Sequence, residues 1–381
     1  ILCIPTAFCS YKGEALDKKT PLLRSMQALD VQAIRILRLF GNKTAKHVTT
    51  SVGAEQEYFL VDKGNFLKRK DLIFTGRTLF GAMPPKGQEM DDHYFGIIRE
   101  RIAAYMRDVN KELWKLGVSA KTQHNEVAPA QHEIDFKYDN ALVTADNIMT
   151  FKMVVKTIAK RHGLYATFMP KPITDVDGSG MHINMSLEKD GKNIFFDKSN
   201  PMGLSKECYH FIAGLIKHAK GMSCICNPLV NSYKRLVPGY EAPVAICWSS
   251  INRSPLIRIP ASRGAGTRIE FRSPDPAANP YLVMALCLAA GLDGIENELE
   301  APEPIGKNMY LLTEEQIADM NIDVLPATLG EACDAFEEDK YIQEVLGEHI
   351  SKKYLEAKRK EWHEYCRQVS DWETEAYLYK Y

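Results

Sequence analysis

The sequence predicts an α+β fold with a largely antiparallel sheet, and three observations support this. Apolar residues recur every three or four positions over several long stretches, which is typical of amphipathic helices. Between them lie short segments that alternate apolar and polar residues, as strands with one buried face do. Helices and strands are interspersed, and the alternation favours antiparallel pairing, because buried parallel strands read as continuous apolar runs.

Helical spacing appears in six regions of the chain. The first has Pro21 in its opening turn, a position that tolerates a missing amide hydrogen. The last is highly charged, and the last five residues of the sequence, 377–381, include three aromatic residues. The predicted helices cover residues 17–40, 93–116, 141–162, 205–222, 280–293 and 331–380.

The predicted strands are short, and the first is the richest in strand-forming residues. Val52, Tyr58, Phe59 and Val61 all favour extended backbone. Residues 63–92 are polar and rich in Gly, Pro and Lys, which indicates a long excursion before the next helix. The predicted strands cover residues 51–61, 164–169 and 181–187, and residues 229–275 are predicted to mix strand and loop.

Composition excludes several classes of function. The 381 residues carry 48 basic and 49 acidic side chains, a net charge of −1, so we expect neither a nucleic-acid partner nor an anionic membrane surface. The longest uncharged apolar stretch, residues 279–292, is too short to span a bilayer. Nine scattered cysteines and no secretory leader predict reduced thiols and a cytoplasmic location.

Two glutamates interrupt the apolar strand SVGAEQEYFLVD, residues 51–62. Glu55 and Glu57 are two positions apart, so their side chains point to the same face, about 7 Å apart along the strand. Like charges on one face repel each other unless they face water or a cation. The strand is therefore either a solvated edge strand or one wall of a cation site.

Three other segments carry charged groups on a predicted strand or beside one. GSGMHINMSL (178–187) alternates, with His182 on its polar face, and TRIEFRS (267–273) places Glu270 between two arginines. In NEVAPAQHE the odd separation of Glu126 and Glu133 would place them on opposite faces, but a bend at Pro129 can turn both to one side. Each pattern alone has an ordinary explanation, such as a structural histidine or a surface ion-pair ladder.

The combination of these segments points to metal binding if their polar faces converge. Carboxylate oxygens with a single imidazole suit Mg²⁺ or Mn²⁺ better than a thiolate-type zinc site. Five carboxylates exceed the need of one divalent ion, so two or more ions are expected. The converging groups would be Glu55, Glu57, Glu126, Glu133, His182 and Glu270.

Arginines are dense between residues 235 and 272. Guanidinium groups bind phosphate and carboxylate bidentately, and the surrounding sequence is mostly apolar, so these side chains need anionic partners. Phosphates bridged by Mg²⁺ are suitable partners, although no P-loop, strand-borne GxGxxG or GxSxG motif is present. The arginines are Arg235, Arg253, Arg258, Arg263, Arg268 and Arg272.

Six motifs in one order resemble the glutamine synthetase family. They are GAEQEYF, NEVAPAQHE, GSGMHINMSL, NSYKRLVPGYEAP, NRSPLIRIP and RIEFRSPDPAANPY, and they run from residue 53 to residue 281. The resemblance implies the family's catalytic domain, a curved antiparallel sheet or half-barrel flanked by helices. It also implies ATP-dependent ligation of ammonia to L-glutamate through a γ-glutamyl phosphate, giving glutamine, ADP and phosphate.

The resemblance also implies residue roles, with two or three Mg²⁺ or Mn²⁺ ions in each site. One ion is held by positions matching Glu57, Glu126 and Glu133, and a second by those matching Glu55, His182 and Glu270. Glutamate-binding positions match Asp177, Gly178, Arg235, Glu241, Arg253 and Arg272. ATP-binding positions match Asn184, Met185, Ser186, Arg253, Arg258 and Arg268. Glu241 and Arg253 match catalytic positions, and Glu241 lies on a flap and helps to take a proton from ammonium.

The organisation of the chain departs from the family pattern. The resemblance implies that residues 1–46 are a lead-in segment and helix at the end of an N-terminal β-grasp domain, which is expected to be missing here, and that residues 47–381 are the catalytic domain. Up to about residue 130 the amino-acid sequence resembles type III enzymes of the family, and after that residue it resembles type I enzymes. Both types form twelve-subunit rings, so the resemblance implies a homo-oligomer, with a dodecamer as the expected assembly.

Three other functions stay open at this stage. A γ-glutamyl ligase acting on an amine such as a polyamine would share the metal-binding residues. A catalytically silent structural member of the fold would be marked by lost metal ligands, and all six are present. A truncated core without the β-grasp domain could bind nucleotide without turnover.

Overall fold

The computed structural model describes residues 25, 28, 30–35, 38, 51–76, 78, 79, 88, 90 and 92–381. Its strands are β1 (Ser51–Asp62), β2 (Ala120–Asn125), β3 (Gln131–Phe136), β4 (Asp139–Asn140), β5 (Leu164–Thr167), β6 (Ile183–Met185), β7 (Glu188–Lys189), β8 (Lys192–Asn193), β9 (Trp248–Ser249), β10 (Ile257–Arg258) and β11 (Ile269–Phe271). Its longer helices are α5 (Glu100–Lys115), α6 (Ala141–Arg161), α7 (Lys206–Cys226), α9 (Pro280–Glu296), α11 (Leu329–Glu338) and α13 (Glu348–Cys366). Its shorter helices are α2 (Lys63–Lys68), α3 (Lys70–Thr75), α4 (Asp92–Phe95), α8 (Ser232–Arg235), α10 (Glu314–Asp319), α12 (Lys340–Leu346) and α14 (Asp371–Tyr377).

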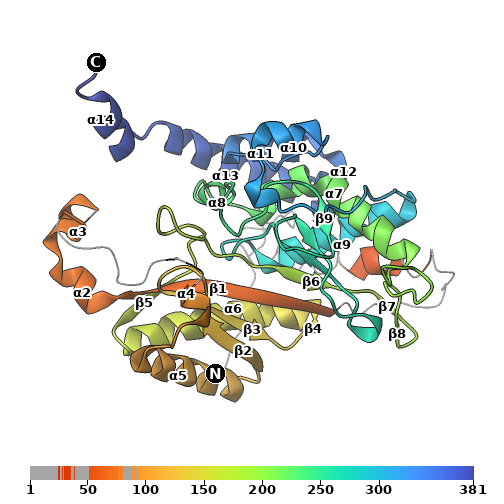
Figure 1. Ribbon diagram of the computed structural model, residues 1–381, viewed down its shortest axis with the longest axis horizontal. Helices are drawn as coiled ribbons and strands as arrows, with labels where there is room; N and C mark the ends of the chain where they lie inside the picture. Colours follow the sequence, from red (N-terminus) through yellow and green to blue (C-terminus); the bar gives the residue numbers. More distant parts are fainter. Residues whose placement is uncertain are drawn as a thin grey trace, which may run out of the picture.

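An open sheet of nine strands forms the centre of the molecule (Figure 1). Its order is β2-β3-β1-β6-β11-β10-β9, and β4 and β5 also pair with β1. Among the described strands, every pairing in this sheet is antiparallel except that of β9 with β10. The predicted α+β fold with a largely antiparallel sheet is therefore confirmed.

Strand β1 is the structural axis of the site. Its twelve residues pair with β3, β4, β5 and β6, so it joins both halves of the sheet. Tyr58 and Phe59 are buried on opposite faces of the strand, so β1 is covered on both sides there. Because β6 and β11 follow β1 in the sheet, residues far apart in the sequence lie on adjacent strands.

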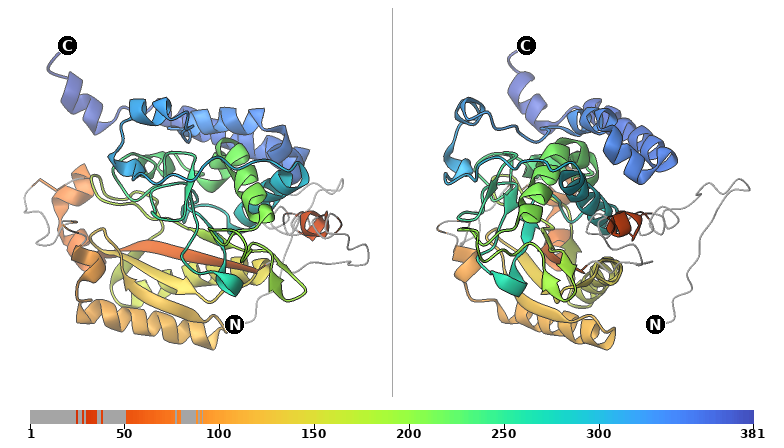
Figure 2. Two further views of the ribbon diagram at one scale, coloured as in Figure 1. Left: turned by 45° about the vertical axis from the view of Figure 1, so that its right-hand side comes forward. Right: turned by 90° about the vertical axis from the view of Figure 1, so that its right-hand side faces the viewer.

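Helices flank the strands on both margins of the molecule. Figure 2 shows α5 along one margin and the C-terminal helices along the opposite one, with the strands between them. Helix α6 begins after Asn140, whose side chain accepts a hydrogen bond from the amide of Val143, and it packs on β1 and β5. Helices α7 and α9 can cross closely because Gly214 of α7 has no side chain. A Cβ at that position would lie 2.0 Å from the backbone oxygen of Ala290.

The predicted elements differ from the observed ones mainly at their ends. The helix predicted at 93–116 is divided into α4 and α5, and the tail predicted at 331–380 is divided into four helices. Gly347 separates α12 from α13, because its φ of +82° is not helical. Glycine adopts this conformation readily, whereas few residues with side chains tolerate it. The excursion predicted at 63–92 contains α2 and α3, and the segment 1–46 lies mostly outside the described residues.

Within the described part of the chain, no helix is both long and apolar enough to cross a membrane. The uncharged stretch at 279–292 instead forms most of α9, whose residues from Pro280 to Gly294 are all buried. Pro280 occupies the first turn, and the side chain of Asn279 caps it by accepting backbone hydrogen bonds from Tyr281 and Leu282.

Candidate active site

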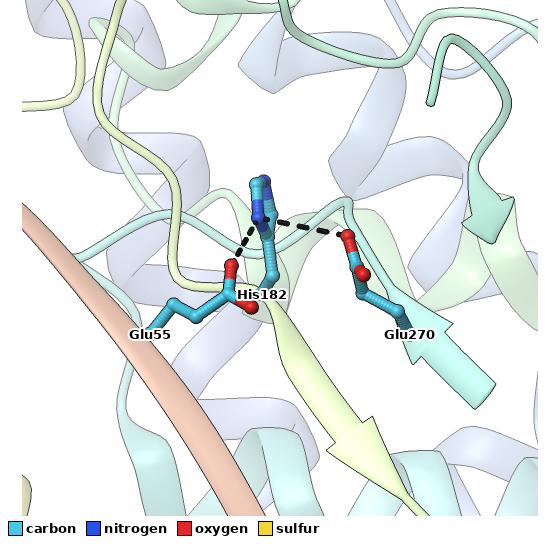
Figure 3. A group of neighbouring side chains, drawn as sticks. All are labelled: Glu55, His182 and Glu270. Carbon is cyan, nitrogen blue, oxygen red and sulfur yellow. Dashed lines mark hydrogen bonds and ion pairs between the residues drawn. The ribbon is translucent and has the colours of Figure 1, made fainter. Parts of the chain in front are cut away.

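Glu55, His182 and Glu270 point toward one another from three adjacent strands or strand ends (Figure 3). Nδ1 of His182 lies 2.8 Å from Oε2 of Glu55 and 4.0 Å from Oε1 of Glu270. The sheet register brings them together, because Ala54 pairs with Ile183 and Glu270 pairs with Asn184. Two carboxylates and an imidazole whose ligand atoms lie within 4.8 Å of one another form a candidate cation site.

A second cluster contains His124, Glu126 and Glu133. Nε2 of His124 lies 3.0 Å from Oε1 of Glu126 and 2.9 Å from Oε2 of Glu133. The bend expected at Pro129 is a tight turn between β2 and β3, in which Ala130 has φ of +64°. The turn reverses the chain, so Glu126 and Glu133 face each other despite their odd separation in the sequence.

Glu57 lies between the two clusters and is held by neutral donors. Its Oε2 accepts hydrogen bonds from the amide of Gly180 at 2.7 Å and from Nε2 of Gln131 at 3.1 Å. A Cβ at Gly180 would lie 2.7 Å from Nε2 of His182 and 2.9 Å from the Arg235 guanidinium, so a larger residue there would displace one of these side chains. Glu57 and His182 line one pocket together with Glu126.

Several of these acidic groups are buried without enough positive charge nearby to offset the loss of solvent, so their pKa values are raised. Burial and repulsion from Glu126 raise the pKa of Glu57 well above its usual value, and burial with the hydrogen bond to Glu126 does the same to the pKa of Glu133. Burial also raises the pKa of Glu55, and the charge of Asp135 adds to this. Such a set of buried carboxylates gains stability from a bound divalent cation, which favours their charged forms.

Neighbouring histidine and arginine side chains shift the pKa values of two further metal-ligand candidates, His182 and Glu126. Burial and the guanidinium of Arg272 lower the pKa of His182 well below its usual value, which keeps the imidazole in the neutral form that ligates metals. Burial tends to raise the pKa of Glu126, but hydrogen bonds with His124 and Glu133 lower it overall. The carboxylates of the two clusters therefore differ in the direction of their pKa shifts: the pKa of Glu126 is lowered, whereas that of Glu55 is raised.

Glu270 is not part of a surface ion-pair ladder. It is 2% exposed, and its two oxygens contact Arg272 at 2.6 Å and Arg258 at 2.7 Å. Arg268 instead donates to Oδ1 of Asn184 at 2.9 Å, and Asn184 donates to Oε1 of Glu55 at 3.2 Å. The arginines therefore contact the candidate metal ligands through both direct and relayed hydrogen bonds.

Four of the candidate glutamate-binding residues line the same pocket, and the other two, Arg253 and Arg272, contact Glu241. Arg235 is almost fully buried, and its guanidinium donates to the backbone oxygens of Ser273 and Arg272. A Cβ at Gly178 would lie 2.5 Å from the backbone oxygen of Pro170, so the backbone there is as tightly packed as at Gly180. The pocket is lined by Glu57, Glu126, Val127, Gln131, Asp177, Gly178, Gly180, His182, Arg235 and Glu241.

Glu241 lies at the mouth of this pocket. Its amide donates to Oδ1 of Asp177 at 3.0 Å, and its carboxylate lies 3.5 Å from the guanidinium of Arg253. Burial raises the pKa of Glu241, and the positive charge of Arg253 opposes this. A carboxylate held in this way is suited to accept a proton close to neutral pH.

The candidate nucleotide-binding residues lie at the β6 end of the site, in two environments. Arg258 and Arg268 reach the clusters from β10 and from the residue before β11, and both are partly exposed. The side chain of Met185 is buried in the core, so it presents backbone rather than side chain at the surface. Met185 and Ser186 also line a small apolar pocket with Phe211 and Leu288.

Sequence reasoning missed three polar neighbours of the expected ligands. His124 pairs with Glu133 across the β2–β3 ladder, Gln131 binds Glu57, and Asp135 lies close to Glu55 and Glu133. His124 was detectable, because it precedes Glu126 by two positions and so shares a face with it in an extended segment. Gln131 and Asp135 were detectable in the same way, because each is two positions from Glu133 in β3. Their contacts with Glu57 and Glu55 depend in addition on the register of β3 with β1.

Comparisons with known proteins agree with one another. The family described as "Glutamine synthetase, catalytic domain" matches residues 35–377, and "Glutamine synthetase type III N terminal" matches residues 1–25. The chain is 49% identical over 343 residues to glutamine synthetase of Clostridium saccharobutylicum, covering 89% of this chain and 74% of that protein. It is 54% identical over 275 residues to glutamine synthetase of Staphylococcus aureus, covering 72% of this chain and 62% of that protein.

Solved structures show the same relationship in three dimensions. A GmaS/ADP complex superposes with a TM-score of 0.77 at 32% identity, covering 96% of this chain and 79% of the other. Plasmodium falciparum glutamine synthetase superposes with a TM-score of 0.77 at 26% identity, covering 96% of this chain and 80% of the other.

Proposed function

This chain belongs to the glutamine synthetase family, and from that membership we propose how its site performs the family's reaction. Glutamine synthetases are ligases that make glutamine from glutamate and ammonia with ATP, and the family uses divalent metal ions. The proposal rests on one observation above all: the six metal-ligand candidates come from distant segments and lie together. Five of them belong to clusters that share Glu55 or Glu133, and Glu57 lines one pocket with Glu126 and His182. We assign the roles below to residues of this chain.

The donor set fits two or three Mg²⁺ or Mn²⁺ ions. Glu57, Glu126 and Glu133 would hold one ion, and Glu55, His182 and Glu270 another. Oxygen donors with one neutral imidazole match the preferences of these ions, and the raised pKa values of Glu57 and Glu133 mark a site that lacks cation charge. Bound there, such ions would neutralise charge on a transferring phosphoryl group.

Glutamate binding falls to residues around the same pocket. Arg235 and Arg272 would face substrate carboxylate, since buried guanidinium groups bind such anions with the strongest hydrogen bonds. Arg253 would stabilise negative charge on the γ-glutamyl phosphate, and the Glu241 carboxylate beside it would take the proton that ammonium must lose before it attacks. Asp177 and Gly178 would hold the rest of the substrate in orientation.

ATP would lie at the β6 end of the site. Arg258 and Arg268 are partly exposed there and present guanidinium groups suited to phosphate oxygens. Asn184 and Ser186 would add polar contacts, and Met185 would contribute backbone, because its side chain is buried. Arg253 would contact both the nucleotide and glutamate.

We also propose an oligomeric state, a domain division and a cellular location for the chain. We infer a homo-oligomer, with a dodecamer as the expected form, and a catalytic domain over residues 47–381 preceded by a lead-in segment. Free cysteines among the described residues support a reducing, cytoplasmic location, since six of the seven are buried and unpaired. Sedimentation of the purified chain would measure its oligomeric state directly.

Phosphate release from ATP in the presence of glutamate tests the reaction. We expect release that depends on ammonium, with far less when methylamine or a polyamine replaces it. Release with an amine but not with ammonium would instead identify a γ-glutamyl-amine ligase, which the same metal ligands could serve. No release under any condition, with ATP still bound, would identify a silent or truncated member of the fold.

A further inference from the structure

Two loops that carry substrate-site residues face each other at the mouth of the pocket. We call residues 170–180 the substrate loop, because it contains Asp177 and Gly178, and residues 237–242 the flap loop, because it contains Glu241. Nζ of Lys171 on the substrate loop lies 3.7 Å from the centre of the Tyr240 ring on the flap loop. At that distance the ammonium group is attracted by the electron-rich face of the ring.

Lys171 is fixed firmly on its own side of this contact. Its amide donates to Oδ1 of Asn231 at 2.8 Å, and Nδ2 of Asn231 donates back to the Lys171 carbonyl at 3.0 Å. Its ammonium also donates to the carbonyl of Val176. Lys171 is only 8% exposed, so the Tyr240 ring covers an ammonium group that its own loop already holds in place.

The flap loop is held by contacts of Tyr240 and Glu241 with neighbouring segments. Besides the ring contact, the Tyr240 hydroxyl donates to Oδ1 of Asp175 at 3.4 Å, and the amide of Glu241 donates to Oδ1 of Asp177 at 3.0 Å. The preceding Gly239 has φ of +91°, and no atom lies within 4 Å of where its Cβ would stand. Arg272 also donates to the backbone oxygen of Glu241 at 3.4 Å, and Arg253 lies 3.5 Å from its carboxylate. Tyr240 adds to these the contact that joins the flap loop to Lys171.

We propose that Lys171 is a positioning residue that holds the flap loop through the Tyr240 ring and so keeps the Glu241 carboxylate at the pocket mouth. The inference rests on the proposed role of Glu241 as the acceptor of the ammonium proton. It requires a cation at position 171 and an aromatic ring at position 240. The tyrosine hydroxyl contributes only the longer contact with Asp175.

Substitutions at the two positions separate this role from general packing. Lys171→Met keeps the volume but removes the charge, and we expect its KM for ammonium to rise about tenfold, within the range of a partly buried cation–π contact. Its KM for ATP should change less than about twofold, because Arg258 and Arg268 are untouched. Lys171→Arg should restore most of the ammonium affinity, since a guanidinium group also binds the face of an aromatic ring.

A double-mutant cycle gives the coupling between the two residues. Tyr240→Leu should raise the KM for ammonium as Lys171→Met does, whereas Tyr240→Phe, which keeps the ring, should raise it much less. Combining Lys171→Met with Tyr240→Leu should cost little more than either change alone. Lys192→Met, which removes an exposed lysine far from the loops, is the matched control for loss of charge.

Chymotrypsin cleavage after Tyr240 tests the attachment without any turnover. Mapped by mass spectrometry, this cut should appear several-fold faster in Lys171→Met than in the wild type or in Lys192→Met. If the wild type makes no glutamine, the proposed function fails and the cleavage rates alone decide the inference. Equal cleavage rates, or additive effects of Lys171→Met and Tyr240→Leu on the KM for ammonium, would overturn it.

Discussion

Glu57→Gln is expected to have opposite effects on stability with and without metal. The side chain is 8% exposed, and its Oε2 accepts hydrogen bonds from the Gly180 amide and from Gln131. Glutamine has nearly the same shape and keeps one oxygen as acceptor, so the substitution removes charge with little change in packing.

In the metal-free chain the substitution should stabilise the fold at alkaline pH. Burial and the Glu126 charge raise the pKa of Glu57 in the folded state above its value in the unfolded chain. A group of this kind contributes stability that is present below the unfolded pKa and is lost as pH rises through the folded pKa. Removing it should therefore be almost neutral near pH 4 and gain about 1–2 kcal/mol near pH 8.

With saturating Mn²⁺ the same substitution should destabilise the fold. Loss of one carboxylate ligand is expected to weaken metal binding by about 10- to 100-fold, comparable to the loss of a supporting partner of a metal ligand. Each tenfold loss removes about 1.4 kcal/mol of the stability that bound metal contributes. The order of the two unfolding midpoints should therefore reverse when metal is added.

Scanning calorimetry at pH 8, with a chelator or with excess MnCl₂, measures both effects. Calorimetric titration of Mn²⁺ gives the change in affinity separately. Glu188→Gln is the matched control, because Glu188 is exposed on β7 and should change neither midpoint. Lower stability of Glu57→Gln in the chelator as well as in MnCl₂, with unchanged Mn²⁺ affinity, would refute the assignment of Glu57 to a metal site.

Three further substitutions test the packing around the site. Gly180→Ala should weaken Mn²⁺ binding at least tenfold by titration, because its Cβ would lie within 3 Å of two site side chains, whereas Gly306→Ala, whose Cβ would make only an ordinary contact with Ile251 at 3.7 Å, should not. Arg272→Met should cost about 3–5 kcal/mol in urea unfolding, because it leaves the buried Glu270 short of a partner; a loss below about 1 kcal/mol would contradict this. Gly214→Ala should lower the unfolding midpoint by several degrees, because its Cβ has no room against α9, and an unchanged midpoint would show that the helices separate freely.

Local sequence patterns predicted those parts of the site that depend on strand geometry. The spacing of Glu55 and Glu57 alone placed both on one face of β1, and the structure has both at the site. The turn near Pro129 likewise brought Glu126 and Glu133 together. These features follow from the two-residue repeat of a strand and from one local reversal of the chain.

Other parts of the fold depend on contacts that the sequence does not display. Asp135 joins the acidic group only because β3 pairs with β1 in the register that sets it opposite Glu55. The ends of the predicted helices were displaced for a different reason. Asp339 caps α12 through its side chain, and Gly347 divides the C-terminal tail, so a continuous charged pattern became separate helices.

The order of β1, β6 and β11 in the sheet has a consequence for biosynthesis. Glu270 leaves the ribosome 215 residues after Glu55, although the sheet order places the two on strands that both flank β6. A nascent polypeptide therefore carries its buried acidic residues for many seconds before the last of them arrives, since translation proceeds at about 5–20 residues per second. The complete set of six groups can therefore assemble only after β11 has left the ribosome.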